Sequence, residues 1–492
     1  MARRWLIVLA LGAIVVAAAV LCFWDLAHNP GGLYTDEAVE ALSAHRILTQ
    51  PGFHPVFFTD GGGREALFAY LAAGVFRFAG ETTLALRATS AGIGVAGVLG
   101  IWLLGRRFGE GTGLVAAAWT AGSLWLICIS RDGMRNILVP VLGALALVAL
   151  LAWADRPTRI RASIAGAVTA LAALYTYQPL KLLPALVILW LLWLRHADRE
   201  RYTRLRTDIG WFVLALAFVA APMVAVAISD PAAYFGRALG VTPFAAGTGG
   251  VNLVDHWLRT LGMFAVTGDP NPRHDVGALP LLGWPATIAA AVGVVRIWRD
   301  RRRPGSSLIL LSLPVFLLPP MIATEGGAPH FLRSLGLAAP LAVTIGVGTV
   351  ELLRLLSDRW GASARNVAAA VVAAGLIGGL GVASGVTYLN RPLAARYDAY
   401  RFDLVAMADA ARPTDAVILD DYDATVIRFL DANGPPAVIA PGSAVSQPAA
   451  FDRVLATDPA DIVRSLGSQV TSRISVIARR PDGSPAVFAA SP

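Results

Sequence analysis

The sequence is poor in cysteine and in charge. Its 492 residues include two cysteines, Cys22 and Cys128, and both lie in apolar runs. This excludes a disulfide framework and a thiolate metal cluster. Only 15% of the residues are charged, whereas 56% are hydrophobic and the mean hydropathy is +0.61. Such a chain is too apolar for a soluble protein, and its composition is typical of a polytopic membrane protein.

Lysine is almost absent, since Lys181 is the only one in the chain. The formal net charge is +8, but the arginines that produce it occur in short clusters between apolar segments. Clusters of this kind are topology signals in membrane proteins. We therefore expect no nucleic-acid partner.

Long apolar segments predict an all-α polytopic membrane domain with about eleven transmembrane helices. A span needs about 20 apolar residues to cross the hydrocarbon core of a bilayer. The predicted spans lie near residues 5–24, 85–105, 112–130, 136–153, 162–178, 180–194, 209–228, 281–297, 307–323, 334–353 and 366–388.

The arginine clusters orient these spans. With the N-terminus inside, every dense cluster faces the cytoplasm, as the positive-inside rule requires. We therefore predict a multi-pass protein of the plasma (inner) membrane, with long outer loops at 25–84 and 229–280 and an extracytoplasmic C-terminus. The clusters are Arg3/Arg4, Arg106/Arg107, Arg156/Arg159/Arg161, Arg195 to Arg206, Arg296 to Arg303 and Arg354/Arg359/Arg365.

The composition changes near residue 389. Residues 1–388 form the predicted transmembrane domain, whereas 389–492 contain short β-prone runs between helical pieces. We predict a small extracytoplasmic α/β domain here, with strands at 416–419, 437–440 and 474–477.

Two adjacent carboxylates, Asp36 and Glu37, lie shortly after the first span, at the start of the predicted outer loop 25–84. Adjacent residues on a helix point about 100° apart, so one can face a reacting group while the other binds an arginine. An ordinary acidic pair at a helix N-terminus is the alternative interpretation.

Basic residues recur on the other predicted outer turns. Arg87 opens the second span, Arg131 lies in the polar turn 130–136, and Lys181 follows Tyr175 and Tyr177. Arginine and lysine bind phosphate, and Arg87 is equally a candidate partner for the carboxylate pair. Interfacial basic residues that snorkel to the headgroups give the same pattern. A further charged turn contains Glu325, His330 and Arg333.

The second outer loop contains Asp269, His274 and Asp275. Two carboxylates and an imidazole are possible metal ligands, but their spacing fits no standard ligand pattern. We therefore predict no metal site and no certain cofactor from the sequence.

Taken in order, these motifs resemble the GT-C membrane glycosyltransferases, in the branch of the protein O-mannosyltransferases and the lipid A aminoarabinose transferase. The likeness covers about residues 1 to 350. The residues that carry it are Tyr34-Thr35-Asp36-Glu37-Ala38, Gly62-Gly63-Arg64-Glu65-Ala66-Leu67, Leu86-Arg87, Ser130-Arg131 and Tyr175-Thr176-Tyr177 near Lys181.

The resemblance implies transfer of a sugar from a polyprenyl-phosphate donor to a lipid, glycan or protein acceptor at the extracytoplasmic face, typically with inversion. It implies Asp36 as the general base and Glu37, the second residue of the catalytic pair, as its structural or acceptor-orienting neighbour. Candidate ligands of the donor phosphate are Arg87, Arg131, Lys181, His330 and Arg333; candidate substrate contacts are Tyr34, Arg64, Glu65, Tyr175, Tyr177 and Glu325.

Three other functions fit the composition. A non-catalytic membrane scaffold that presents the C-terminal domain is one, but it needs neither an acidic pair nor arginines on several outer turns. A polymerase or ligase of lipid-linked glycans also handles polyprenyl phosphates at the outer face. A secondary transporter is polytopic as well, but it is expected to contain inverted repeats and broken helices at the membrane midplane, and the charges here cluster at one face.

Overall fold

The computed structural model describes residues 2–60, 62–243, 252–431, 434–444 and 450–492. Residues 244–251, in the predicted outer loop 229–280, lie outside this described part. The chain divides into two compact units. The first contains residues 1–24, 55–68 and 90–388, and the second contains 25–54, 69–89 and 389–492.

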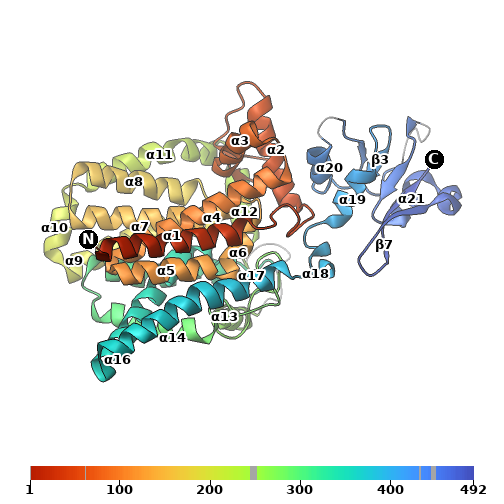
Figure 1. Cartoon of the computed structure of the whole chain (residues 1–492). Coiled ribbons are helices and arrows are strands. Elements are labelled where there is room, and N and C mark those ends of the chain that lie inside the picture. The colour runs from red at the N-terminus through yellow and green to blue at the C-terminus, as the bar shows by residue number, and fades with distance from the viewer. Residues whose placement is uncertain (1, 61, 244–251, 432–433, 445–449) are drawn as a thin grey trace. The chain divides into compact units, whose positions relative to one another are not determined.

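The first unit is a bundle of apolar helices (Figure 1). A short hairpin of β1 (Phe57–Phe58) and β2 (Arg64–Glu65) accompanies it. The helix α4 (Thr83–Gly105) contributes to both units. The other helices are α1 (Ala2–Phe23), α5 (Glu110–Gly122), α6 (Leu124–Arg131), α7 (Leu138–Asp155), α8 (Arg159–Leu174), α9 (Leu183–Ala197), α10 (Arg199–Arg206), α11 (Ile209–Ser229), α12 (Pro231–Gly240), α13 (Leu253–Gly262), α14 (Gly283–Arg299), α15 (Pro304–Ile322), α16 (Ala338–Ala374) and α17 (Gly381–Leu389).

Each of the eleven predicted spans overlaps a helix, but fewer helices have the length of a full crossing. Within the described residues, seven are long and apolar enough to span a membrane, or eight if the pair α5 and α6, bent by 59°, is one span. The helices α8 and α14 have only 16 and 17 residues. The helix α16 joins two predicted spans across a kink at Gly361. The number of spans therefore stays a prediction.

Glycines allow the long helices to approach closely. A Cβ atom at Gly348 of α16 would lie 1.7 Å from the carbonyl oxygen of Ala289 in α14. A Cβ atom at Gly166 of α8 would lie 2.1 Å from the carbonyl oxygen of Phe212 in α11. Small residues at such crossings are typical of helix packing in membranes, where backbone contact replaces the hydrophobic driving force.

Arginines from four of the six predicted cytoplasmic clusters lie around one cavity of the bundle. This cavity of about 620 Å³ is lined by basic and acidic side chains from connections that are far apart in the sequence. Opposite charges pair along it, for example Arg107 with Asp155 at 2.8 Å. The lining charges are Arg107, Asp155, Arg201, Arg296, Asp300, Arg303, Glu351 and Arg354.

The second unit contains a five-stranded sheet with strand order β4-β3-β5-β7-β6. β3 pairs in parallel with β4 and β5, and β7 pairs antiparallel with β5 and β6. The sequence predicts β3, β4 and β6 but not β5 or β7. The strands are β3 (Ala416–Ile418), β4 (Ala437–Ile439), β5 (Val454–Ala456), β6 (Ser475–Arg479) and β7 (Pro485–Ala490).

Helices complete this unit (Figure 1). The strands β3 and β5 bury Ile418 and Val454 in a core shared with Ile462 of α21. Besides part of α4, the helices are α2 (Thr35–Thr49), α3 (Leu67–Ala79), α18 (Leu393–Tyr397), α19 (Phe402–Ala410), α20 (Ala424–Leu430) and α21 (Pro459–Leu466).

Candidate active site

The turn before the acidic pair is built on glycine. Gly31 and Gly32 have φ angles of +74° and +52°, which glycine adopts without strain. Their carbonyl oxygens accept hydrogen bonds from Nη2 of Arg87 at 3.2 and 3.1 Å. The helix α2 then begins at Thr35, so Asp36 and Glu37 lie in its first turn.

Glu37 is held by Arg87. The Nε and Nη2 atoms of Arg87 donate to the two carboxylate oxygens of Glu37, each at 2.8 Å. Both side chains are buried, with 1% and 0% exposure. This bidentate geometry is the strongest form of an arginine–carboxylate pair. The pairing favours a positioning role for both residues. The Arg87 guanidinium binds a carboxylate here, which favours this role over a contact with the donor phosphate.

Asp36 is only half-buried, and its partner is different. Its Oδ1 accepts a hydrogen bond from the hydroxyl of Tyr422 at 2.8 Å, and that hydroxyl also lies 3.4 Å from the hydroxyl of Tyr34. Burial and the charge of Asp36 raise the pKa of Tyr422, so the phenol stays protonated and donates. Asp36 is thus the accessible carboxylate of the pair. Tyr422 follows β3 by four residues, and no sequence motif indicated it.

In the first unit, the carboxylate of Glu65 forms ion pairs with two basic side chains. It lies 3.2 Å from Nε of Arg135 and 3.3 Å from Nζ of Lys181. The Arg135 guanidinium also lies over the Tyr177 ring, and Lys181 over the Tyr234 ring. The structure thus brings Glu65, Tyr177 and Lys181 together. It adds Arg135, which lies in the polar turn 130–136 but carried no separate sequence signal.

Arg131 has a different environment. It is fully buried, and it donates to the carbonyl oxygens of Leu21, Cys22 and Trp24 at the end of α1. Leu21 and Cys22 lie in the last turn of α1, and Trp24 directly follows the helix. Carbonyl groups at a helix end lack intrahelical donors. The arrangement favours a structural role for Arg131 over the phosphate contact suggested by the sequence.

Two other candidate residues, Arg64 and Tyr175, form hydrogen bonds with different partners. Arg64 donates to the carboxylate of Asp60 at 2.9 Å. The hydroxyl of Tyr175 donates to the carbonyl oxygen of Val219 at 2.8 Å. Neither contact joins the group around Glu65.

Arg333 and Glu325 pair within one turn. Arg333 donates to the carbonyl oxygen of Ala323 at 2.8 Å, to that of Glu325, and to the Glu325 carboxylate at 3.2 Å. The side chain of Arg333 is 10% exposed and that of Glu325 is 65% exposed. Arg333 is thus held by the turn, and the Glu325 carboxylate faces outward.

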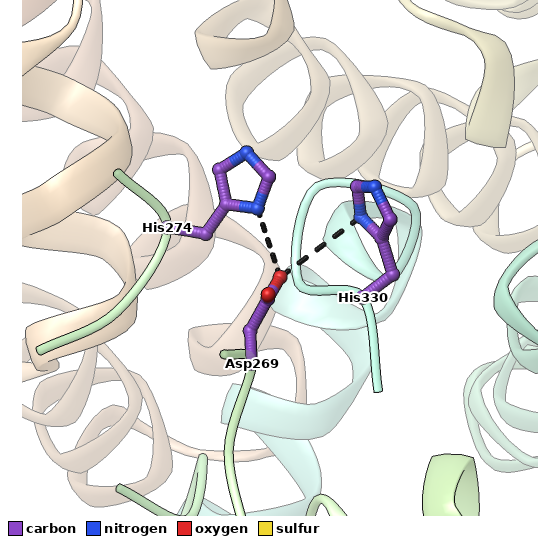
Figure 2. Close-up of side chains that lie close together, drawn as sticks. All are labelled: Asp269, His274 and His330. Carbon is purple, nitrogen blue, oxygen red and sulfur yellow. Dashed lines mark hydrogen bonds and ion pairs between the residues drawn. The ribbon is translucent and has the colours of Figure 1, made fainter. Parts of the chain in front are cut away.

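The remaining candidate, His330, lies beside Asp269 and His274 (Figure 2). Nδ1 of His274 is 2.8 Å from Oδ2 of Asp269, and Nδ1 of His330 is 4.0 Å from the same oxygen. Burial lowers the pKa of His274 and, with the nearby charge of Arg333, lowers the pKa of His330 to about 3. Both imidazoles are therefore neutral near pH 7. The sequence showed Asp269 and His274 together but gave no sign that His330 joins them.

Comparisons with known proteins agree on one fold. The family model of dolichyl-phosphate-mannose-protein mannosyltransferases matches residues 65–226. No match is found among curated protein sequences.

Two solved structures illustrate the likeness. ArnT from Cupriavidus metallidurans bound to undecaprenyl phosphate has a TM-score of 0.59 and 14% identity, covering 99% of this chain and 98% of its own. AglB, the archaeal oligosaccharyltransferase from Archaeoglobus fulgidus, in complex with an inhibitory peptide and a dolichol-phosphate, has a TM-score of 0.57 and 14% identity, covering 100% of this chain and 74% of its own. The resemblance seen in the sequence is confirmed at the level of the fold: this is a multi-pass membrane protein with the GT-C fold of the membrane glycosyltransferases.

Proposed function

We propose that this protein transfers a sugar from a polyprenyl-phosphate donor to a hydroxyl group of a lipid or glycan acceptor, with Asp36 as the general base. The observation that carries the proposal is that the two adjacent carboxylates, in a chain with the GT-C fold, differ in burial and in pairing. Glu37 is buried on Arg87, whereas Asp36 keeps accessible surface at the start of α2. The fold supports the class of reaction, and the accessible carboxylate supports the choice of base.

The reaction needs one proton acceptor and one stabiliser of the leaving group. The acceptor oxygen attacks C1 of the sugar and forms the new glycosidic bond, and its proton passes to the Asp36 carboxylate. The bond between C1 and the phosphate oxygen breaks with inversion, and its electron pair leaves with the polyprenyl phosphate. The negative charge that develops on this phosphate requires fixed cationic donors.

Lys181 is the donor that we propose for the phosphate, with Arg333 as a second candidate. Arginine dominates the basic residues of this chain, so a lone lysine is unusual, and its compact ammonium suits a phosphate oxygen. The Lys181 side chain is 21% exposed and lies on Glu65, which orients it. Glu65 keeps Arg135 as a partner if Lys181 moves towards a ligand.

We expect Lys181→Ala to weaken the binding of undecaprenyl phosphate about 10- to 100-fold, because a hydrogen bond to a charged group contributes about 1.5–3 kcal/mol. Binding to protein in nanodiscs measures this directly. Arg199→Ala, which removes an exposed arginine of α10, is the matched control and should bind like wild type. Unchanged affinity in Lys181→Ala would assign the phosphate to other residues.

We further propose that Asp36 and the C-terminal sheet lie at the extracytoplasmic face. Arginines from four of the six predicted inside clusters line one cavity of the first unit, which supports a common side for these four connections. Their density then indicates the cytoplasmic side.

Cysteine labelling in intact cells tests this topology. The native Cys22 and Cys128 are buried, so the background is low. A cysteine at position 302, between α14 and α15, should react with an impermeant thiol reagent only after the membrane is permeabilised. A cysteine in place of the exposed Asp421 should react in intact cells. The reverse result would invert the proposed topology.

The transfer itself is tested with purified protein. Incubation with polyprenyl-phosphate sugars should release polyprenyl phosphate in the presence of a lipid or glycan acceptor. Turnover only with a lipid-linked oligosaccharide would favour the polymerase or ligase alternative, and binding without turnover would favour transport.

A further inference from the structure

The cluster of Asp269, His274 and His330 joins two segments that are distant in the sequence. Asp269 and His274 lie between α13 and α14, and His330 lies between α15 and α16. All three side chains converge on one point (Figure 2). Their ligand atoms lie within 4.8 Å of one another.

Protein hydrogen bonds do not explain the whole cluster. The contact of 2.8 Å between His274 Nδ1 and Asp269 Oδ2 is an ordinary hydrogen bond. The 4.0 Å between His330 Nδ1 and the same oxygen is too long for one. Ligands that share a zinc ion lie about 2.0–2.2 Å from the metal, so they are roughly 3–4 Å from each other. The 4.0 Å between His330 Nδ1 and Asp269 Oδ2 lies at the upper end of this range and fits two ligands of one ion.

Buried nitrogen atoms add a second observation. Nδ1 of His330 and Nε2 of His274 are buried and have no hydrogen-bond partner among the described residues. A buried polar group without a partner is unfavourable, because it has lost its hydrogen bonds to water and gained none in return. A metal on the His330 nitrogen removes that cost at this atom.

The carboxylate is already oriented. Oδ1 of Asp269 accepts from the backbone N–H of Asn271 at 2.8 Å, and Oδ2 accepts from the N–H of Phe331 at 2.7 Å. Hydrogen bonds of this kind fix a carboxylate for metal binding. The Phe331 contact also places the neighbouring His330 next to the carboxylate.

We propose that Asp269, His274 and His330 bind a divalent transition metal, with zinc as the best fit, and that this ion holds the α13–α14 segment to the α15–α16 turn. Two imidazoles and a carboxylate form a set that zinc binds with tetrahedral geometry, leaving a fourth position to water. The ion would fix the turn that carries Arg333. The inference stands independently of the proposed transfer reaction.

Metal titration of the full-length protein tests the proposal. The protein is purified in detergent without a histidine tag, stripped with a chelator, and titrated with zinc against a chromophoric competitor. We expect one zinc per chain for wild type, and at least a tenfold loss of affinity in His274→Gln and in His330→Gln. At the same zinc concentration, zinc should also raise the thermal midpoint of wild type by more than that of either variant.

His256→Gln is the matched control. His256 is also a buried histidine, but its Nε2 contacts the carbonyl oxygen of Pro320 at 2.9 Å, and it is not among the residues of the cluster. This variant should retain zinc. Zinc binding that is equal in wild type and all three variants would overturn the proposal.

X-ray absorption at the zinc edge gives a test that does not depend on variants. The wild-type protein should show only nitrogen and oxygen ligands, with two imidazoles. A spectrum with sulfur ligands, or with a single imidazole, would place the ion elsewhere and overturn the proposal even if the variants fail to fold.

Discussion

Asp36→Asn is expected to lower sugar transfer about 100- to 10,000-fold, which is the usual contribution of a positioned general base. The amide keeps the size of the side chain and can still accept the hydrogen bond from Tyr422, which is 2.8 Å from the carboxylate. It cannot take up the proton of the acceptor hydroxyl. Because Asp36 is half-buried and Glu37 keeps its own partner, the thermal midpoint should change little.

Asp421→Asn is the control for this result. Asp421 lies next to Tyr422, and its side chain is 94% exposed, so loss of its charge should leave transfer unchanged. Initial rates with a saturating lipid-linked donor compare the two variants. Equal and near-normal rates would remove Asp36 from the mechanism and direct attention to Glu37.

Arg87→Ala is expected to destabilise the protein by about 3–5 kcal/mol, because it leaves the buried charge of Glu37 without its partner. The pair is bidentate, with both distances at 2.8 Å, and the Arg87 side chain is only 1% exposed. The carbonyl oxygens of Gly31 and Gly32 also lose their donor. The turn that precedes Asp36 should loosen, so activity should fall together with stability.

Thermal unfolding in detergent measures the effect against Arg77→Ala, which removes an exposed arginine of α3 in the same unit. This control should stay within about 0.5 kcal/mol of wild type. The double variant Glu37→Leu/Arg87→Met should be more stable than Arg87→Ala, because replacing both charges leaves no unpaired ion. If Arg87→Ala unfolds like the control, the pair does not stabilise the turn.

The sequence was sufficient for the class of fold, because hydropathy and arginine clusters are local signals. Each predicted span overlaps a helix, and the strands β3, β4 and β6 coincide with apolar runs. The boundaries of the helices and strands were harder to predict from the sequence. A kink at Gly361 merges two predicted spans into α16, and β5 is a three-residue strand with no alternating pattern to indicate it.

The candidate site was only partly predictable, because its contacts join residues far apart in the chain. The acidic pair could be recognised because its two residues are adjacent in the sequence. That Arg87 binds Glu37 and not Asp36 depends on the geometry of the turn at Gly31 and Gly32. Tyr422 is separated from Asp36 by 386 positions. His330 is likewise distant from Asp269 in the sequence, because a different interhelical segment carries it.

The most direct test of the proposed function separates chemistry from binding in Asp36→Asn. Single-turnover release of polyprenyl phosphate is measured beside the equilibrium affinity for the same lipid-linked donor. A general base acts on the acceptor in the transition state, so the rate of release should fall at least about 100-fold with little change in donor affinity. A wild-type rate of release in this variant, or a loss of donor affinity that accounts for the whole defect, would contradict the role of Asp36 as the base.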